Sequence, residues 1–321
     1  MASAPAGSRN RFPAPQRGEG GRGANGRAAG LLALATGLAL VLGACTGPPS
    51  APGQPFRDAR ALAVTPDGTL WVVEGADGTV LAIRDGAVVQ RLGGVGTGDQ
   101  AFLDPVGVDP TNGQAIYVAD RAAGLVVQFT AQGRRAGALV VPDLDGASAR
   151  QPAGDFGRET TRGQPMAVAA ASDGTVFVID GGRGHVLRLS NEGTVERVLG
   201  AGTLGDPVAL SLADDGTLWV ADAGRGGVQP FDAFGSAGAF VPAPGLGRIV
   251  GVSVGRSGLL VVGTDAAVLT VGGEIVARTE AGALGTVRGA VVWRGRALLL
   301  SATAFDGPAA SEVGRLATPL R

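Results

Sequence analysis

One short phrase is repeated along most of this chain, and its spacing limits the folds available. Each copy is an apolar run that follows a turn and, in the clearest copies, ends on an acidic residue. Successive copies lie 46, 60, 42, 41 and 38 residues apart. A period near forty residues with strand-like content is typical of a radial array of small sheets rather than a helical solenoid. The residues that end the runs are Glu74, Asp120, Asp180 and Asp222, with Gly263 and Ser301 in two degenerate copies.

Each copy predicts a meander of four strands, because apolar runs rich in Val, Leu and Ile alternate with Asp-Gly, Asn-Gly or Gly-Gly turns. In the fourth copy the predicted strands are Pro207–Ala213, Thr217–Ala221, Gly227–Asp232 and Ser236–Val241. The runs are apolar on both sides, as expected of a sheet packed between two others. Large apolar residues recur at one position of the second strand, and we expect them to pack between blades rather than to stack on a sugar. They are Trp71, Tyr117, Phe177, Trp219 and Leu260.

The repeats resemble the NHL family of six-bladed β-propellers. The fourth copy meets almost the whole family pattern, at Leu204, Pro207, Asp215, Gly216, Leu218, Val220, Ala221, Asp222, Val228, Phe231, Asp232 and Gly235. The resemblance covers residues 57–321 and implies an all-β fold of six four-stranded antiparallel blades. It implies little about chemistry, because this scaffold carries both binders and enzymes.

The last repeats depart from the pattern. The fifth copy lacks the acid, and the sixth has three clear strands. These are Val287–Trp293, Arg296–Ala302 and Val313–Thr318. We expect Pro55–Arg60 to help close the ring beside the last blade.

The N-terminus resembles a bacterial lipoprotein signal. Arg22 and Arg27 precede the apolar stretch Leu31–Leu42, which is too short to span a bilayer and fits a signal-peptide core. The next residues, Gly43 and Ala44, lead to Cys45, the only cysteine, in a sequence that resembles a lipobox. A lone cysteine forms no internal disulfide, so we expect it to carry a diacylglyceryl group with fatty acyl chains such as palmitate, rather than to be a buried or accidental thiol.

These features predict three parts of the chain: a signal peptide at 1–44, the acylated cysteine with a flexible tether at 45–56, and the propeller at 57–321. The predicted location is the extracytoplasmic side of the bacterial cell envelope, with the membrane leaflet left open. Without residues 1–44 the chain carries 22 basic and 27 acidic residues. That balance argues against a nucleic-acid partner, which requires a basic face.

The repeated acids have a structural and a metal-binding interpretation. At the end of a second strand, a carboxylate can accept hydrogen bonds from backbone N–H groups of the following turn. The metal interpretation is disfavoured because the second strand lies about 4.8 Å outside the innermost one. Four carboxylates on so wide a ring cannot all reach one ion. We therefore expect no metal and no cofactor.

Known enzymes with a six-bladed propeller fold allow a sharper test of whether this chain carries catalytic or metal-binding residues. Gluconolactonase-like proteins hold a divalent metal with acidic and amide side chains near the start of innermost strands. The corresponding tripeptides here carry no oxygen ligand; they begin at Pro105, Pro165 and Pro207. Other propeller enzymes depend on histidines, and this chain has one, His185.

His185 belongs to the predicted binding surface. A long insertion, Pro142–Gln164, separates the second and third copies and carries charged residues typical of a recognition loop. We expect it on the same face as the repeated acids. The alternative for His185 is a solvated turn residue. The residues predicted to bind a partner are Asp120, Asp180, Arg183, His185, Asp222 and Arg225.

The sequence thus favours a membrane-anchored, monomeric, extracytoplasmic propeller that binds a protein, peptide or glycan through this face. It favours binding over catalysis but leaves the question of an enzyme open. One alternative is a metal-dependent, gluconolactonase-like hydrolase that works from the central channel. Another is a structural spacer.

Overall fold

A computed structural model describes residues 56–85, 87–94, 98, 100–110, 115–144, 162–256, 258–280, 287–293, 296–301 and 305–306. The chain divides into two compact units, Met1–Gly47 and Pro48–Arg321, and every described residue belongs to the second. The predicted signal peptide, Cys45 and all of the predicted tether except Phe56 lie outside the described residues. Within the described part, no helix is long and apolar enough to cross a membrane.

The described residues form six antiparallel sheets whose strands follow one another in chain order. Blade one contains β1 (Ala59–Val64), β2 (Leu70–Glu74), β3 (Thr79–Arg84) and β4 (Ala87–Gly93). Blade two contains β5 (Pro105–Asp109), β6 (Ala115–Asp120), β7 (Leu125–Thr130) and β8 (Arg135–Val140). Blade three contains β9 (Pro165–Ala170), β10 (Val176–Asp180), β11 (His185–Leu189) and β12 (Val195–Leu199). Blade four contains β13 (Pro207–Leu212), β14 (Leu218–Asp222), β15 (Gly227–Phe231) and β16 (Val241–Pro242).

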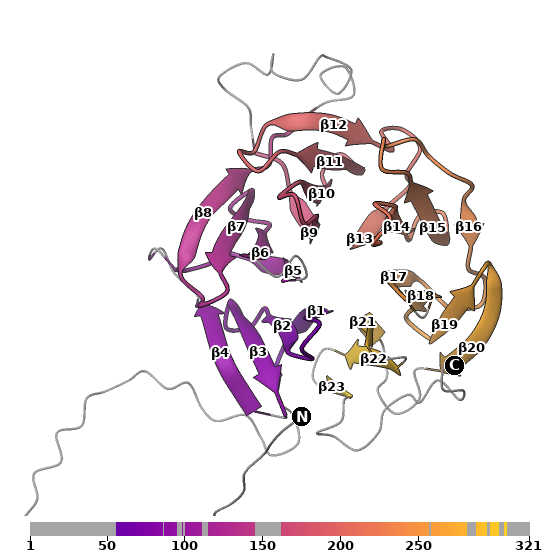
Figure 1. The fold of residues 1–321 in the computed structure, drawn as a ribbon, viewed down its shortest axis with the longest axis horizontal. Helices are drawn as coiled ribbons and strands as arrows, with labels where there is room; N and C mark the ends of the chain where they lie inside the picture. The colour runs from indigo at the N-terminus through magenta and orange to yellow at the C-terminus, as the bar shows by residue number, and fades with distance from the viewer. Residues whose placement is uncertain are drawn as a thin grey trace, which may run out of the picture. The chain divides into compact units, whose positions relative to one another are not determined.

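The remaining two sheets differ in strand number. Blade five contains β17 (Ile249–Gly255), β18 (Gly258–Gly263), β19 (Ala266–Val271) and β20 (Glu274–Glu280). The sixth sheet contains β21 (Val287–Trp293), β22 (Arg296–Ser301) and β23 (Phe305–Asp306). Figure 1 shows the sheets arranged around a central axis, with the first strand of each sheet innermost. The predicted all-β propeller of four-stranded antiparallel blades is confirmed for five blades, and the sixth sheet has three described strands.

The hydrophobic core is divided among the interfaces between neighbouring sheets. Each of six clusters of buried side chains draws on two adjacent sheets. The repeated large residues of the second strands lie in these clusters, with Trp71 between blades one and two and Tyr117 between blades two and three. Their predicted role in inter-blade packing is confirmed. Apolar residues on both faces of each strand are therefore explained by burial against two neighbours.

The segment before β1 joins the first blade to the last sheet. Phe56 is 2% exposed and packs in a cluster with Leu298 and Leu300 of β22. The Arg288 guanidinium in β21 donates to Asp58 at 2.8 Å. These contacts agree with the prediction that Pro55–Arg60 helps close the ring, for the residues from Phe56 onward.

One predicted strand needs correction, and another is not tested. The strand expected at Ser236–Val241 is reduced to β16, Val241–Pro242, with one isolated bridge between Phe231 and Ala237. The reason is Pro230 in β15, which has no N–H for a ladder. Strand Val313–Thr318 lies outside the described residues, and the third described strand of the last sheet is Phe305–Asp306.

The two faces of the ring are distinguished by their loops. The hairpins between first and second strands carry Asp-Gly-Thr turns at Asp67, Asp173 and Asp215, each of which accepts the N–H two residues later at 2.9–3.1 Å. Hydrogen bonds, led by the Thr65 hydroxyl for Asp67 and by the backbone N–H for the other two, lower the pKa of these carboxyls. We call this side the turn face and the opposite side, where the second strands end, the acid face.

Candidate functional site

The repeated acids of the acid face act as clamps on the chain that enters each blade. Asp222 lies at the end of β14 and is fully buried. Its two oxygens accept the N–H groups of Gly205 and Asp206 at 2.9 Å, and one of them also accepts the N–H of Arg225 at 3.1 Å. Glu74 and Asp120 make the same three kinds of bond. The bond to the following turn confirms the structural interpretation, and the bonds to the incoming segment extend it.

The clamp of blade three is incomplete. Asp180 accepts the N–H groups of Gln164 and Gly182 through Oδ1, at 2.9 and 3.0 Å. Its Oδ2 is buried and has no hydrogen-bond partner among the described residues. The expected donor, Gly163, donates instead to the carbonyl of Val141 at 2.8 Å. At the point where the insertion joins blade three, one carboxylate oxygen therefore has no hydrogen-bond donor among the described residues.

His185 lies beside this incomplete clamp. It begins β11, directly opposite Asp180 in the ladder between β10 and β11, and is 2% exposed. The alternative of a solvated turn residue is therefore wrong, because the strand starts earlier than the glycine-rich turn suggested. Its Nε2 is buried without a partner in the described part of the chain. Burial lowers the pKa of His185, helped by Arg183 and opposed by the nearby carboxylates of Asp180 and Asp143.

The two predicted arginines already have intramolecular partners. Arg183 pairs with Asp143 at the root of the insertion, with Nη2 at 3.1 Å from Oδ2. Arg225 stacks over the ring of Phe240 at 3.9 Å and donates to Gln229 at 3.0 Å. Both arginines remain exposed. The structure brings Asp180, Arg183 and His185 together, whereas Asp120 and Asp222, with Arg225, belong to the clamps of other blades.

A chain of ion pairs on the acid face runs along the rim of the channel from the last sheet, through blade one, to blade two. Asp58 receives Arg288 and Arg60, both at 2.8 Å. Asp104 then receives Arg60 and, at 2.7 Å, Arg121. Burial raises the pKa of Asp58, but bonds from the two arginines outweigh it and lower the pKa. Burial likewise lowers the pKa of Arg60, and the two carboxylates raise it.

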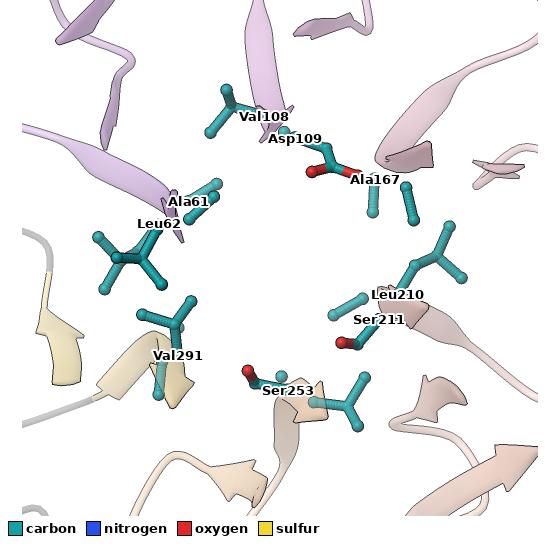
Figure 2. Close-up of a pocket in the computed structure, with 18 of the residues that line it drawn as sticks. Ala61, Leu62, Val108, Asp109, Ala167, Leu210, Ser211, Ser253 and Val291 are labelled. Atoms are coloured by element: carbon teal, nitrogen blue, oxygen red, sulfur yellow. The ribbon is translucent and has the colours of Figure 1, made fainter. Parts of the chain in front are cut away.

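The innermost strands enclose a channel of about 1250 Å³ (Figure 2). At the positions where a lactonase-like metal site was tested, its wall is formed by Val106, Met166 and Val208. These side chains supply no hard oxygen ligand for a divalent cation. Among the described residues, no group of three or more His, Cys, Asp or Glu side chains is placed to hold a metal ion.

Comparison with known proteins bears on the fold. No protein-family model and no curated protein matches the chain. Among solved structures, a streptogramin B lyase is similar over 77% of this chain and 78% of its own, with 14% identity and a TM-score of 0.57. A virginiamycin B lyase from Staphylococcus aureus is similar over 78% of this chain and 83% of its own, with 13% identity and a TM-score of 0.53.

A chain in a nidogen/laminin complex is similar over 73% of this chain and 85% of its own, with 14% identity and a TM-score of 0.56. At such low identity these likenesses concern the fold alone, which is an all-β propeller. Because lyases and a protein complex appear together, the fold by itself does not select between catalysis and binding.

Sequence reasoning missed the ion pairs at the channel mouth. Arg60 lies in β1 and Arg121 follows β6, so no shared repeat position marks them. It also missed three polar side chains inside the channel. A detectable feature was available there: Asp109, Ser211 and Ser253 each precede the large second-strand residue by seven or eight positions.

Proposed function

We propose that this protein is an exported, lipid-anchored propeller with six NHL-like blades that binds a protein, peptide or glycan partner through its acid face. The resemblance of Leu42–Cys45 to a lipobox supports the anchor. The match of the fourth copy to the NHL repeat pattern supports the proposed membership of the NHL family. The proposed location is the extracytoplasmic side of the cell envelope.

The incomplete clamp of blade three carries the proposal for the binding face. Here the insertion replaces a clamp bond that blades one, two and four all make. Its two described ends are paired by a bridge between Pro142 and Arg162, so the insertion is held at its base. Arg183 and Asp143, both at least partly exposed, add charge beside it. A feature that departs from the repeat at a structural cost is a candidate for function rather than folding.

A binding role fits the chemistry of the channel mouth better than catalysis does. The carboxylates of Asp58 and Asp104 are each engaged by two arginines. The bonds from Arg60 and Arg288 lower the pKa of Asp58, so its carboxylate is a poor general base at neutral pH. Alternating charges instead suit a partner surface that presents both signs.

A crosslinking experiment tests the binding face. A photoreactive residue replaces Arg162 on the acid face, and a matched one replaces Asn191, an exposed residue of the turn face. In native membranes we expect discrete adducts from position 162 that decrease when Arg183 is changed to Glu. Equal adducts from position 191, or no response to Arg183→Glu, would contradict the proposal.

The anchor has its own test. Cys45→Ser removes the proposed acylation site, so the protein should move from the membrane fraction to the soluble fraction and lose incorporation of labelled palmitate. Ala44→Ser is the control, because a small residue remains before the cysteine. A Cys45→Ser protein that stays in the membrane fraction would refute the anchor without affecting the binding face.

A further inference from the structure

The innermost strand of each sheet has a bulge near the acid face. In all six sheets, the ladder between the first and second strands skips the second residue of the innermost strand. A bulge turns a side chain away from its place in the ladder, and every skipped residue lines the channel. We call these places the rim positions. They are occupied by Arg60, Val106, Met166, Val208, Val250 and Arg288.

Two neighbouring sheets carry arginine at the rim position. Arg60 belongs to β1 and Arg288 to β21, and these strands lie side by side where the first blade meets the last sheet (Figure 1). The other four rim positions are apolar and only partly buried. A repeat position that is apolar in four sheets and cationic in two neighbours departs from the pattern on one side of the channel. The rim therefore has a cationic side and an apolar side.

A third arginine joins the cationic side. Arg121 follows β6, lines the channel and shares the carboxylate of Asp104 with Arg60. Its Nη1 also lies 3.9 Å from Sδ of Met166, which is an apolar rim residue. The cationic side thus continues from the last sheet to blade two and ends beside blade three. We call Arg60, Arg121 and Arg288 the rim arginines.

The rim arginines keep charge and hydrogen-bond donors for a ligand. Three guanidinium groups share two carboxylates, Asp58 and Asp104, so one positive charge is in excess. A guanidinium group has five N–H donors, and that of Arg288 makes one hydrogen bond in the described part of the chain. The side chains of Arg60, Arg121 and Arg288 are 26%, 40% and 44% exposed, so a ligand in the channel can reach them.

The other charged residues of the channel lie farther from the acid face. Asp109 ends β5, Asp214 follows β13, and Arg256 follows β17. Innermost strands begin at the acid face, so these three residues lie toward the turn face. Their formal charges add up to one negative charge, which disfavours a second anionic group deeper in the channel.

We propose that the acid-face rim of the channel binds a single carboxylate group attached to an apolar substituent. The rim arginines donate to the carboxylate oxygens, and the substituent contacts the apolar rim positions. Arginine suits a planar carboxylate, because two parallel N–H groups match its two oxygens. One carboxylate balances the excess charge, whereas a phosphate monoester, with a charge near −2, would leave negative charge unpaired.

Methionine methyl NMR tests the proposal on the full-length chain that carries Cys45→Ser. Met166 is one of two methionines and lies beside Arg121, so its methyl signal, assigned with Met166→Leu, reports binding at the rim. The probes are N-acetyl-leucine, uncharged N-acetyl-leucinamide, and isocaproate, which has the carbon skeleton of leucine without the nitrogen. We expect saturable shifts with the two carboxylates. The amide should bind about tenfold more weakly, because it loses charge-assisted hydrogen bonds.

Comparison of the two carboxylates identifies the source of the ligand. Tighter binding of N-acetyl-leucine indicates the C-terminus of a peptide, and tighter binding of isocaproate indicates a free organic acid. Three results would overturn the proposal. They are equal binding of N-acetyl-leucine and its amide, absence of saturable shifts with both carboxylates, and binding of inorganic phosphate as tight as that of the carboxylates.

Variants at one rim position locate the ligand. Arg288→Val should weaken carboxylate binding about tenfold. Valine occupies the rim position of blades two, four and five, which supports folding of this variant. Arg288→Lys keeps the charge without the paired N–H groups, so its affinity should lie between those of wild type and Arg288→Val. Arg248→Ala is the matched control and should leave binding unchanged, because Arg248 is an exposed, ion-paired arginine outside the channel lining.

A further variant leaves every rim arginine in place. Arg60 donates to the carbonyl of Pro105 at 3.2 Å, so its guanidinium group reaches the start of β5. If Arg288→Val fails to fold, Val106→Glu serves instead, because it supplies an internal carboxylate beside Arg60 and should abolish the shifts.

Unchanged carboxylate binding in Arg288→Val or, where that variant does not fold, in Val106→Glu would refute the site. A loss in Arg248→Ala as large as that in Arg288→Val would place the ligand outside the channel and refute it as well. The site does not depend on the proposed binding of a partner beside blade three. Failure of the crosslinking at position 162 and failure of carboxylate binding are therefore separate results.

Discussion

The clamps of blades three and four differ in one bond, although their acids occupy the same position of the repeat. Asp222 uses both carboxylate oxygens on the chain entering blade four. Asp180 uses one, because Gly163 donates to Val141 at the base of the insertion. The repeat therefore determines where the acid lies, whereas the connection before each blade determines how fully the acid is used.

The largest expected effect compares these two acids directly. Asp222→Ala leaves three backbone N–H groups without their acceptor and should lower the free energy of unfolding by about 3–5 kcal/mol. Asp180→Ala affects two such groups and should cost about 2–3 kcal/mol. Urea unfolding measures both. Asp222→Asn, which keeps one acceptor oxygen, is the control and should lie between wild type and Asp222→Ala.

Equal losses of unfolding free energy in the two alanine variants would show that the missing bond in blade three has no energetic consequence. The proposed difference between the clamps of blades three and four would then be wrong.

The next effect is the pH dependence of blade three, which we expect to be smaller than the loss in Asp222→Ala. Burial lowers the pKa of His185 in the folded protein. Protons then bind the unfolded chain more readily, so stability is complete above the ordinary histidine pKa near 6.5 and falls as pH decreases through that value toward the folded pKa. The urea midpoint should decrease between about pH 7.5 and 5.5.

His185→Leu should remove that decrease, because no other histidine is present. The charged groups that face His185 are Asp180, Arg183 and Asp143. A pH dependence that persists unchanged in His185→Leu would contradict the assignment.

Blade five provides a weaker test, since it lacks the acid. Thr264 follows Gly263 there, and its hydroxyl oxygen accepts the N–H of Arg248 at 3.2 Å. Thr264→Ala removes a neutral bond near the surface and should lower the free energy of unfolding by about 1 kcal/mol. Thr264→Ser keeps the hydroxyl and should retain most of the stability. A loss as large as that in Asp222→Ala would mean that the hydroxyl replaces the carboxylate fully.

The smallest expected change in stability concerns the ion pair between Arg183 and Asp143 on the acid face of blade three. Asp143→Ala removes an ion-pair partner of Arg183, whose side chain is 41% exposed. Solvent-exposed ion pairs contribute about 0–1 kcal/mol, so the urea midpoint should change little. A loss well above this range would make the pair part of the fold and remove it from the proposed binding face.

The sequence predicted the parts of the fold that recur and missed those that occur once. Trp71 and Tyr117 were assigned correctly to blade interfaces, because the same position is large and apolar in successive copies. Ser236–Val241 was predicted wrongly because a single Pro230 breaks the ladder beside it. A feature that recurs in several copies can be predicted even when one copy departs from it, whereas a feature found in a single copy, such as Pro230, leaves no repeated pattern.

The candidate site was less predictable for the same reason. Asp180, Arg183 and His185 were grouped correctly because they are close in sequence. The burial of His185 was missed, since the Gly181–Gly184 turn suggested solvent. Arg60 and Asp104 meet across two blades over 44 residues, a distance at which pattern alone carries no information about contact.

The contact between Asp58 and Arg288 spans 230 residues and joins the first blade to the last sheet. During synthesis, Phe56 and the other apolar residues at that seam must wait until nearly all of the chain has been made before they can be covered. Contacts of such long sequence separation form slowly, and an uncovered apolar surface promotes association in the meantime. We therefore expect a nascent chain of this protein to be most prone to association through the apolar seam of blade one, until the last sheet has been synthesised and covers it.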